Sequence, residues 1–236
     1  MKKQVTIVRS AVSSLPSAGI INLLRENGFR IAGMDLTDKS AGRHLVDSFH
    51  LVSRSSESTR DKVIREIIAI AGMEKADWII SGPENEIALL ASAEDQFTAM
   101  GCFLFHPVAE TLRIVTDKAK LNIFLSENNF PVMPFAYKGS VIPGFGPGEL
   151  VFKPSKGRGS SGVKFIRNTK EEISAVLSEA GEEEFILQPR LKGKEYTVDV
   201  LCDMSGRVTD IVPRERIAVE SGISVASKTV KNESLT

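Results

Sequence analysis

The chain has 236 residues, and its 30 Lys+Arg balance its 30 Asp+Glu to a formal net charge of zero. This length suits one large domain or two small ones, and either can bury a core. Hydrophobic residues at 42% and charged residues at 25% are ordinary globular values, which exclude a disordered or fibrous chain. The balanced charge argues against a protein that coats nucleic acid or an anionic membrane, so we expect neither as a partner.

The N-terminal region contains no recognisable targeting segment, because Arg9 interrupts the apolar stretch that follows Lys2 and Lys3. No apolar run approaches the roughly 20 residues needed to span a bilayer. The two cysteines, Cys102 and Cys202, form no C-x-x-C pair, and we expect two reduced, largely buried thiols. Together these features predict a cytoplasmic protein.

Strand and helix patterns alternate in the N-terminal part of the chain. Strands are predicted over residues 4–8, 30–35, 77–81 and 102–105, and helices over residues 17–27, 58–71 and 85–100. Such alternation is typical of a parallel sheet that is covered by helices on both faces. We therefore expect a Rossmann-like α/β domain over residues 1–112.

After residue 112 the pattern changes and strands dominate. A helix over residues 117–128 precedes a short strand that ends at Tyr137, and residues 138–148, with four glycines and two prolines, predict a mobile surface loop. Strands are then predicted over residues 150–154, 163–166, 185–191, 195–202 and 207–213. One helix interrupts them over residues 169–180, opened by a capping-box pattern at residues 168–172. These elements predict an α+β domain over residues 113–236.

A glycine-rich segment lies between two of these strands. Gly157, Gly159 and Gly162 match G-x-G-x-x-G, but a strand rather than the helix of a dinucleotide site follows them. A Walker A loop is excluded because Val163 stands where that motif needs lysine. A strand–loop–strand flap remains, whose backbone N–H groups could close over phosphates. The alternative, a flexible hairpin with solvated Lys156 and Arg158, stays open.

Two lysines are placed unusually for solvated side chains. Lys153 lies in the apolar strand before the glycines, on the same face as Val151 and opposite Leu150 and Phe152. Lys118 lies in the first turn of its helix, where the helix dipole disfavours a cation. Lys153 is therefore well placed to hold a phosphate oxygen.

The strand over residues 185–191 stops near a proline, and such an end can offer backbone groups to the edge of an adenine. Glu195 begins the next strand and shares one face with Thr197 and Asp199. A carboxylate at this point suits the two hydroxyls of a ribose, although the wet face of an edge strand would look the same.

Taken together, these segments resemble the ATP-grasp superfamily, and more closely the branch represented by the large subunit of carbamoyl-phosphate synthetase. The resemblance covers roughly residues 115–230, and the preceding α/β domain resembles a pre-ATP-grasp domain. Its segments, in order, are Thr116-Asp117-Lys118, Phe130-Pro131-Val132, Phe152-Lys153-Pro154-Ser155 with the loop Gly157–Gly162, Gln188–Leu191, Lys192–Asp199 and Val212–Arg216.

The resemblance implies an ATP site. Lys118 and Lys153 would contact the phosphates, and Gly157, Gly159, Ser160, Ser161 and Gly162 would close over them. Gln188 would stand near the adenine amino group, where the family usually has a glutamate, and the backbone of Arg190 and Leu191 would contact the purine edge. Glu195 would bind the ribose. Arg214 and Arg216 would act at the acyl phosphate, with Lys228 as a neighbour, because phosphoryl transfer depends on positioning and charge neutralisation.

The resemblance also implies Mg²⁺, bound in the family by a Glu and an Asn near the close of the domain. Those ligands are expected beyond residue 236, so the ATP-grasp domain is expected to lack its last strands. Asn232 and Glu233 lack a flanking apolar strand and are not assigned as ligands. His44, His50 and His106 have no metal-ligand spacing, and we assign them no metal site.

Three functions remain open. The first is an ATP-dependent carboxylate–amine ligase, which would activate a small carboxylate, an amino-acid-like substrate or bicarbonate as an acyl phosphate. The second is an incomplete nucleotide-binding module or split subunit that needs another chain, with a homodimer or a companion subunit as its assembly. The third is an NAD(P)-binding protein, suggested by Asp35 at the end of the second strand, although the turn after the first strand has no glycine pattern.

Overall fold

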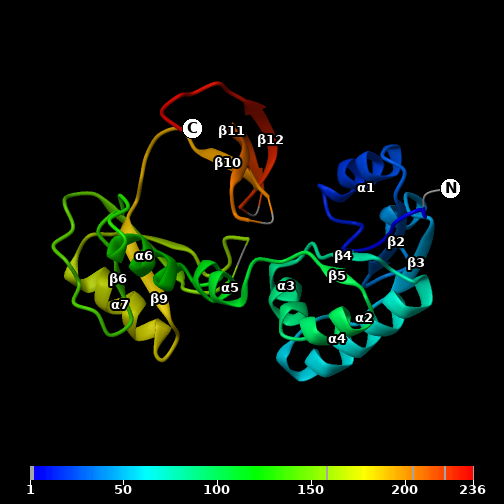
Figure 1. The fold of residues 1–236 in the computed structure, drawn as a ribbon. Coiled ribbons are helices and arrows are strands. Elements are labelled where there is room, and N and C mark those ends of the chain that lie inside the picture. Colours follow the sequence, from blue (N-terminus) through cyan, green and yellow to red (C-terminus); the bar gives the residue numbers. More distant parts are fainter. Residues whose placement is uncertain (1–2, 158, 204, 221, 236) are drawn as a thin grey trace. The chain divides into compact units, whose positions relative to one another are not determined.

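The computed structural model describes residues 3–157, 159–203, 205–220 and 222–235 (Figure 1). The chain forms two compact units, Met1–Arg113 and Ile114–Thr236, and each is described by itself. Among the described residues, none of the helices has the length and apolar character that crossing a membrane requires.

Unit 1 is built on a five-stranded sheet in which all neighbouring strands are parallel. The strand order is β3-β2-β1-β4-β5, so the chain changes direction between β1 and β4. The strands are β1 (Thr6–Ser10), β2 (Arg30–Asp35), β3 (Ser48–Leu51), β4 (Trp78–Ile80) and β5 (Phe103–Leu104). The predicted parallel sheet is confirmed, but β3 was not predicted, because it has only four residues and none of them is fully buried.

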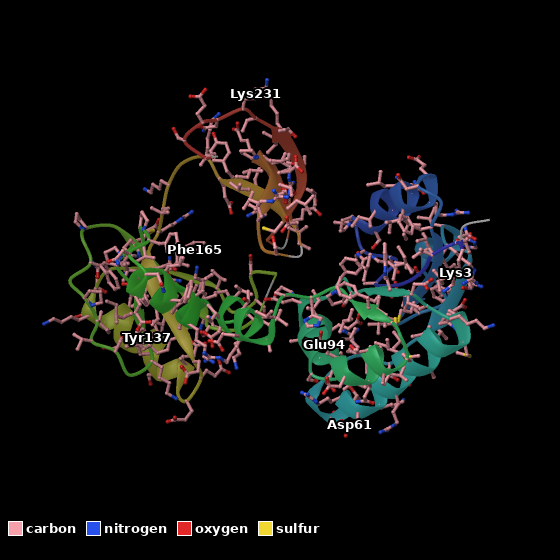
Figure 2. The ribbon with its side chains drawn as sticks, viewed as in Figure 1. Lys3, Asp61, Glu94, Tyr137, Phe165 and Lys231 are labelled. Atoms are coloured by element: carbon pink, nitrogen blue, oxygen red, sulfur yellow. The ribbon has the colours of Figure 1, made fainter. Side chains whose placement is uncertain are left out.

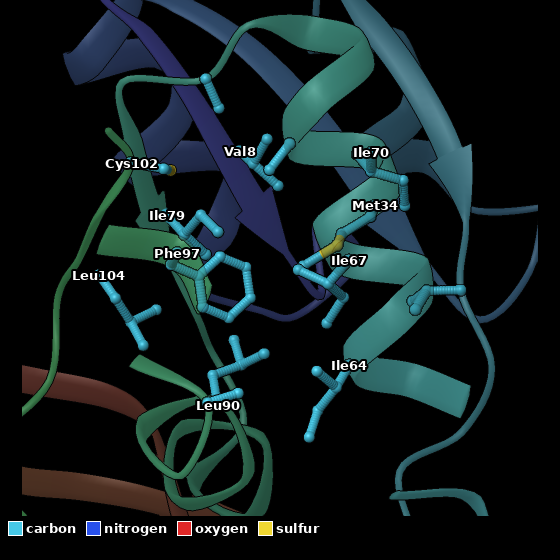
Figure 3. Close-up of a cluster of buried hydrophobic side chains, with 14 of the residues drawn as sticks. Val8, Met34, Ile64, Ile67, Ile70, Ile79, Leu90, Phe97, Cys102 and Leu104 are labelled. Carbon is cyan, nitrogen blue, oxygen red and sulfur yellow. The ribbon is translucent and has the colours of Figure 1, made fainter. Parts of the chain in front are cut away.

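Helices cover both faces of this sheet. On one face, α2 packs Ile64, Ile67 and Ile70 over side chains of β1, β2 and β4, as Figure 3 shows. On the other face, Ile21 of α1 packs with Ile7 and Ile31. The helices are α1 (Ser17–Glu26), α2 (Arg60–Glu74), α3 (Glu84–Ala91), α4 (Glu94–Ala99) and α5 (Ala109–Val115), with 3-10 turns η1 (Ala41–His44) and η2 (Glu57–Thr59).

The prediction of one helix over residues 85–100 is wrong, because α3 ends at Ala91 and α4 begins at Glu94. The Ser92 hydroxyl donates to the Leu89 carbonyl at 2.6 Å. A serine that bonds to the backbone in this way competes with the helical hydrogen-bond pattern, so the helix breaks there. The short α5 was also not predicted; Leu112 is its one buried residue.

The first part of unit 2 is an antiparallel sheet with the order β6-β9-β7-β8. Val176 and Ala180 of α7 pack with Phe152 and Leu187 on one face, while α6 packs against β9. These elements are α6 (Lys118–Glu127), β6 (Ala136–Tyr137), β7 (Glu149–Pro154), β8 (Lys164–Arg167), α7 (Lys170–Ala180) and β9 (Phe185–Pro189).

The capping box predicted at the start of α7 is half formed. The Thr169 hydroxyl accepts from the Glu172 N–H at 3.3 Å, whereas the Glu172 carboxylate accepts from the Arg167 N–H at 2.6 Å instead of reaching back to Thr169. Residues 138–148 contain no helix or strand, as expected for a loop. The Asn168 amide anchors this loop by donating to the carbonyls of Phe145 and Gly146, each at 3.0 Å.

The second part of unit 2 is a three-stranded antiparallel meander of β10 (Tyr196–Cys202), β11 (Val208–Glu220) and β12 (Ile223–Thr229). β11 is longer than predicted and β12 was not predicted, because register shifts after Arg216 and Ala218 disturb the two-residue alternation. Met204, in the predicted turn between β10 and β11, lies outside the described residues. Cys102 is buried as expected, at 2% exposed, but Cys202 is exposed, so that part of the thiol prediction is wrong.

A polar cluster joins the end of α2 to the edge of the parallel sheet. The Glu74 carboxylate accepts from Arg30 Nη1 and lies beside His50 Nε2, each at 2.6 Å. Burial alone would raise the pKa of Glu74, but hydrogen bonds with His50, Ser48 and Arg30 hold it at about 2, below its usual 4.5. Glu74 therefore stays ionised in the folded chain at pH values where the unfolded chain protonates it.

This difference makes the stability of unit 1 sensitive to acid. The contribution of Glu74 is complete above pH 4.5 and disappears as the pH falls toward about 2. We expect Glu74→Gln to lower the free energy of unfolding at neutral pH by about 1–3 kcal/mol and to weaken its fall with acid. Urea unfolding at several pH values measures this, with exposed Glu26→Gln as the control. A Glu74→Gln variant with the wild-type pH dependence contradicts the assignment.

Candidate functional site

A pocket of about 510 Å³ lies in unit 2 on the face of the antiparallel sheet opposite α7. Val151, Lys153, Phe165 and Gln188 form its floor, and residues 189–195 form one wall. The pairing of β7 with β9 sets Val151 opposite Gln188. Because side chains alternate along a strand, Leu150 and Phe152 enter the core while Val151 and Lys153 face the pocket, which confirms the face predicted for Lys153.

Lys153 is the half-buried cation of this pocket. Its ammonium group has no hydrogen-bond or ion-pair partner within the described part of the chain. Burial, and then the charge of Lys118, lower the pKa of Lys153. An anion bound beside it would compensate both effects, because a buried charge is costly unless it is paired.

Lys118 reaches the same end of β7 from α6. It is the first residue of that helix, and its ammonium group donates to the carbonyls of Gly157 at 2.8 Å and Pro154 at 3.2 Å. The structure therefore brings Lys118 and Lys153 together at the start of the glycine loop. Asp117 and Ser155, which the sequence placed in the matching segments without a role, join α6 to the end of β7.

The glycine loop connects β7 to β8, so a strand follows the glycines, as predicted. Its site residues, Gly157, Gly159, Ser160, Ser161 and Gly162, are all exposed, and Arg158 lies outside the described residues. Gly157, Gly159, Ser160 and Gly162 have positive φ. Position 162 requires glycine for two reasons. Its φ is +71°, and a Cβ there would lie 2.7 Å from Pro154 Cγ.

The other end of the pocket carries the groups expected at a purine. The Gln188 side-chain amide has no hydrogen-bond partner among the described residues. The Arg190 N–H donates to the Glu149 carbonyl at 2.8 Å, so it is already occupied, whereas the Leu191 N–H bonds to no described residue. The Arg190 guanidinium lies 4.4 Å from the centre of the Phe165 ring, a residue labelled in Figure 2 that the sequence reasoning did not assign to the site.

The two arginines of β11 that were predicted at the acyl phosphate are both in ion pairs. Arg216 forms an ion pair with Glu195, and Arg214 forms one with Asp199. Glu195, the carboxylate predicted to bind the ribose, is thus paired with Arg216, one of the two arginines predicted at the acyl phosphate. Glu215 is opposite Lys228 and Arg216 is opposite Ser227, so Lys228 lies on the other face of the sheet from Arg216.

The described residues contain no group of three or more His, Cys, Asp or Glu side chains that could hold a metal ion. In unit 1, the Asp35 carboxylate already accepts from the N–H groups of Ser13 at 2.9 Å and Leu36 at 2.7 Å. This leaves little support for Asp35 as a ribose ligand of NAD(P).

Comparisons with known proteins identify the family. The ATP-grasp domain family matches residues 115–235, about half of the chain. The chain therefore belongs to the ATP-grasp family. No curated protein matches its sequence.

Solved structures share the fold at low identity. N5-carboxyaminoimidazole synthetase from Staphylococcus aureus, complexed with ADP, has a TM-score of 0.67 and 14% identity, over 94% of this chain and 57% of that one. The biotin carboxylase domain of Hydrogenobacter thermophilus 2-oxoglutarate carboxylase, with MgADP, ADP and bicarbonate, has a TM-score of 0.69 and 16% identity, over 95% and 53%. L-amino acid ligase from Bacillus licheniformis has a TM-score of 0.66 and 12% identity, over 92% and 51%.

These similarities show a parallel α/β unit followed by antiparallel sheets of the ATP-grasp fold, as predicted. The chain spans about half the length of these three structures. The more specific likeness to carbamoyl-phosphate synthetase stays a prediction.

The glycine loop yields a stability prediction. Gly162→Ala adds a clash with Pro154 to an unfavourable φ, whereas Gly139→Ala adds only the unfavourable φ, since Gly139 (φ +84°) faces open space. We expect Gly162→Ala to lower the free energy of unfolding by about 1–3 kcal/mol more than Gly139→Ala does. Urea unfolding of the two variants measures the difference, and equal losses contradict the packing at Gly162.

Proposed function

We propose that this chain binds ATP in the pocket of unit 2 and acts as a carboxylate–amine ligase, in the manner of carbamoyl-phosphate synthetase. A carboxylate or bicarbonate oxygen attacks the γ-phosphorus of ATP, ADP leaves, and an acyl phosphate forms. The amine nitrogen then attacks the acyl carbon, phosphate leaves, and the nitrogen loses a proton. The protein's part is positioning and charge neutralisation.

The half-buried ammonium group of Lys153, which has no partner among the described residues, carries this proposal. It lies where β7 enters the glycine loop, and Lys118 reaches the same point. Phosphates at this end would be held by Lys118, Lys153 and the backbone of Gly157, Gly159, Ser160, Ser161 and Gly162.

The opposite end of the pocket would take the nucleoside. Gln188 would face the purine in this arrangement, together with the Leu191 N–H, which bonds to no described residue. Arg190 would contribute its carbonyl and its stack on Phe165. Glu195 would bind the ribose hydroxyls. Because its carboxylate is ion-paired with Arg216, it would either accept hydrogen bonds from both groups or break the ion pair. Arg214 and Arg216 would neutralise the acyl phosphate, whereas Lys228 lies on the other face of the sheet and is left out of this group.

The fold neighbours support the reaction class. One is named an L-amino acid ligase, and others were solved with ADP, MgADP or bicarbonate. Mg²⁺ would neutralise charge on the phosphates when bound. The described residues contain no group of three or more His, Cys, Asp or Glu side chains that could hold it by themselves.

A second candidate is a nucleotide-binding module that needs another chain for turnover. The observation that favours it is that the chain spans about half the length of the three structures. In this case a second copy or a companion subunit would supply the metal ligands. A cytoplasmic location suits both candidates.

Nucleotide binding is tested by titrating ATP into wild type, Lys153→Ala and, as a matched control, Lys170→Ala, whose exposed side chain lies on α7. Loss of a charged hydrogen bond predicts that Lys153→Ala weakens ATP binding by about tenfold or more, and that Lys170→Ala does not change it. Isothermal titration calorimetry with and without Mg²⁺ gives the dissociation constants. A wild type that does not bind millimolar ATP, or an unchanged Lys153→Ala, contradicts the proposal.

Turnover separates the two candidates. ADP release with Mg²⁺ and a panel of amino acids or bicarbonate supports the ligase. ATP binding without release on any substrate supports the module.

A further inference from the structure

The two lysines of the proposed phosphate site come from different elements. Lys118 opens α6, and Lys153 lies in β7, 35 residues later. The charge of Lys118 acts on Lys153 and lowers its pKa, so the two ammonium groups repel each other and the folded chain must hold them in place. Asp117 and Ser155 hold the two elements together.

Asp117 and Ser155 are 4% and 0% exposed, and they form a buried connection between the two elements. The Ser155 hydroxyl donates to Asp117 Oδ1 and accepts from the Ala119 N–H at 3.2 Å. In the other direction, the Lys118 N–H donates to the Ser155 carbonyl at 2.8 Å. The first turn of α6 is thus attached to the end of β7 through both the backbone and the side chain of one serine.

Asp117 also caps α6. Its Oδ1 accepts from the N–H groups of Ala119 at 3.1 Å and Lys120 at 3.2 Å. Burial by itself would raise the pKa of this carboxyl, but the hydrogen bonds from Ser155, Lys120 and Ala119 lower it on balance. The carboxylate therefore stays ionised at neutral pH.

The connection fixes where Lys118 points. Its backbone is bonded to Ser155, two residues after Lys153, and its ammonium group reaches the carbonyls of Pro154 and Gly157 at the base of the glycine loop. Without the connection, the start of α6 would be free to move away from β7.

We propose that Asp117 and Ser155 are positioning residues, which hold the first turn of α6 on the end of β7 so that Lys118 and Lys153 face the same phosphate. The proposal rests on the proposed function, since it assigns the lysines to ATP. Neither Asp117 nor Ser155 needs to touch the nucleotide.

The experiment compares Asp117→Ala and Ser155→Ala with Thr169→Ala. Thr169 caps α7 as Asp117 caps α6, but it lies away from the pocket, so Thr169→Ala removes a helix cap without moving the lysines. ATP dissociation constants are measured by calorimetry at a temperature where circular dichroism shows every variant folded. Acetylation of Lys118 by a small reagent, followed by mass spectrometry, reports its release without any nucleotide.

We expect Asp117→Ala and Ser155→Ala each to weaken ATP binding about tenfold and to raise the acetylation rate of Lys118. Thr169→Ala should change neither. Asp117→Asn keeps the acceptor oxygen for the cap and for Ser155, so it should restore most of the affinity. The double variant should lose little more than either single variant, because both remove one connection.

Unchanged affinity in both alanine variants overturns the proposal, as does an equal loss in Thr169→Ala. If wild type binds no ATP, the proposed function fails, and acetylation then decides the positioning role. Faster labelling of Lys118 in the two alanine variants supports that role, and unchanged labelling overturns it.

Discussion

The ammonium group of Lys153 lies half-buried on β7 and has no partner among the residues that the structure describes. Such a group costs free energy in the unliganded protein, and the nearby charge of Lys118 adds to this cost. The fold must therefore stabilise the arrangement elsewhere, through the packing of the sheet and the buried Asp117–Ser155 connection. A bound phosphate would remove the cost, so we expect the site to favour anions although the whole chain is neutral.

The antiparallel sheet of unit 2 carries both the core and the site, because consecutive side chains of a strand point to opposite faces. Phe152 and Leu187 pack under α7, while Lys153 and Gln188, one residue further along the same strands, face the pocket. A shift of register by one residue would exchange the two sets. Core packing and the position of the site are thus fixed by the same pairing of β7 with β9.

The alternation of strands with helices, the alternation of side chains along a strand and the positions of the glycines could be recognised in the sequence. They predicted the parallel sheet of unit 1, the face of Lys153 and the strand after the glycine loop. The break between α3 and α4 could not be predicted, because it depends on one Ser92 hydroxyl bond in a helical pattern. β12 was missed because bulges disturb its pairing with β11.

The candidate site was predictable only where a residue type was unusual for its surroundings, as with Lys118 and Lys153. Asp117 looks like an ordinary helix cap and Ser155 like a loop serine until the fold buries them together. The pairing of Arg216 with Glu195 likewise depends on which strands become neighbours, which no local pattern contains.

The central claim is that Lys118 and Lys153 hold the phosphates of one nucleotide. The most direct measurement is nitrogen NMR of the lysine ammonium groups, with resonances assigned through Lys118→Arg and Lys153→Arg, while ATP or adenosine is added. We predict that ATP shifts both the Lys118 and the Lys153 resonances and that adenosine shifts neither. Shifts confined to other lysines, or equal shifts with adenosine, would contradict the account.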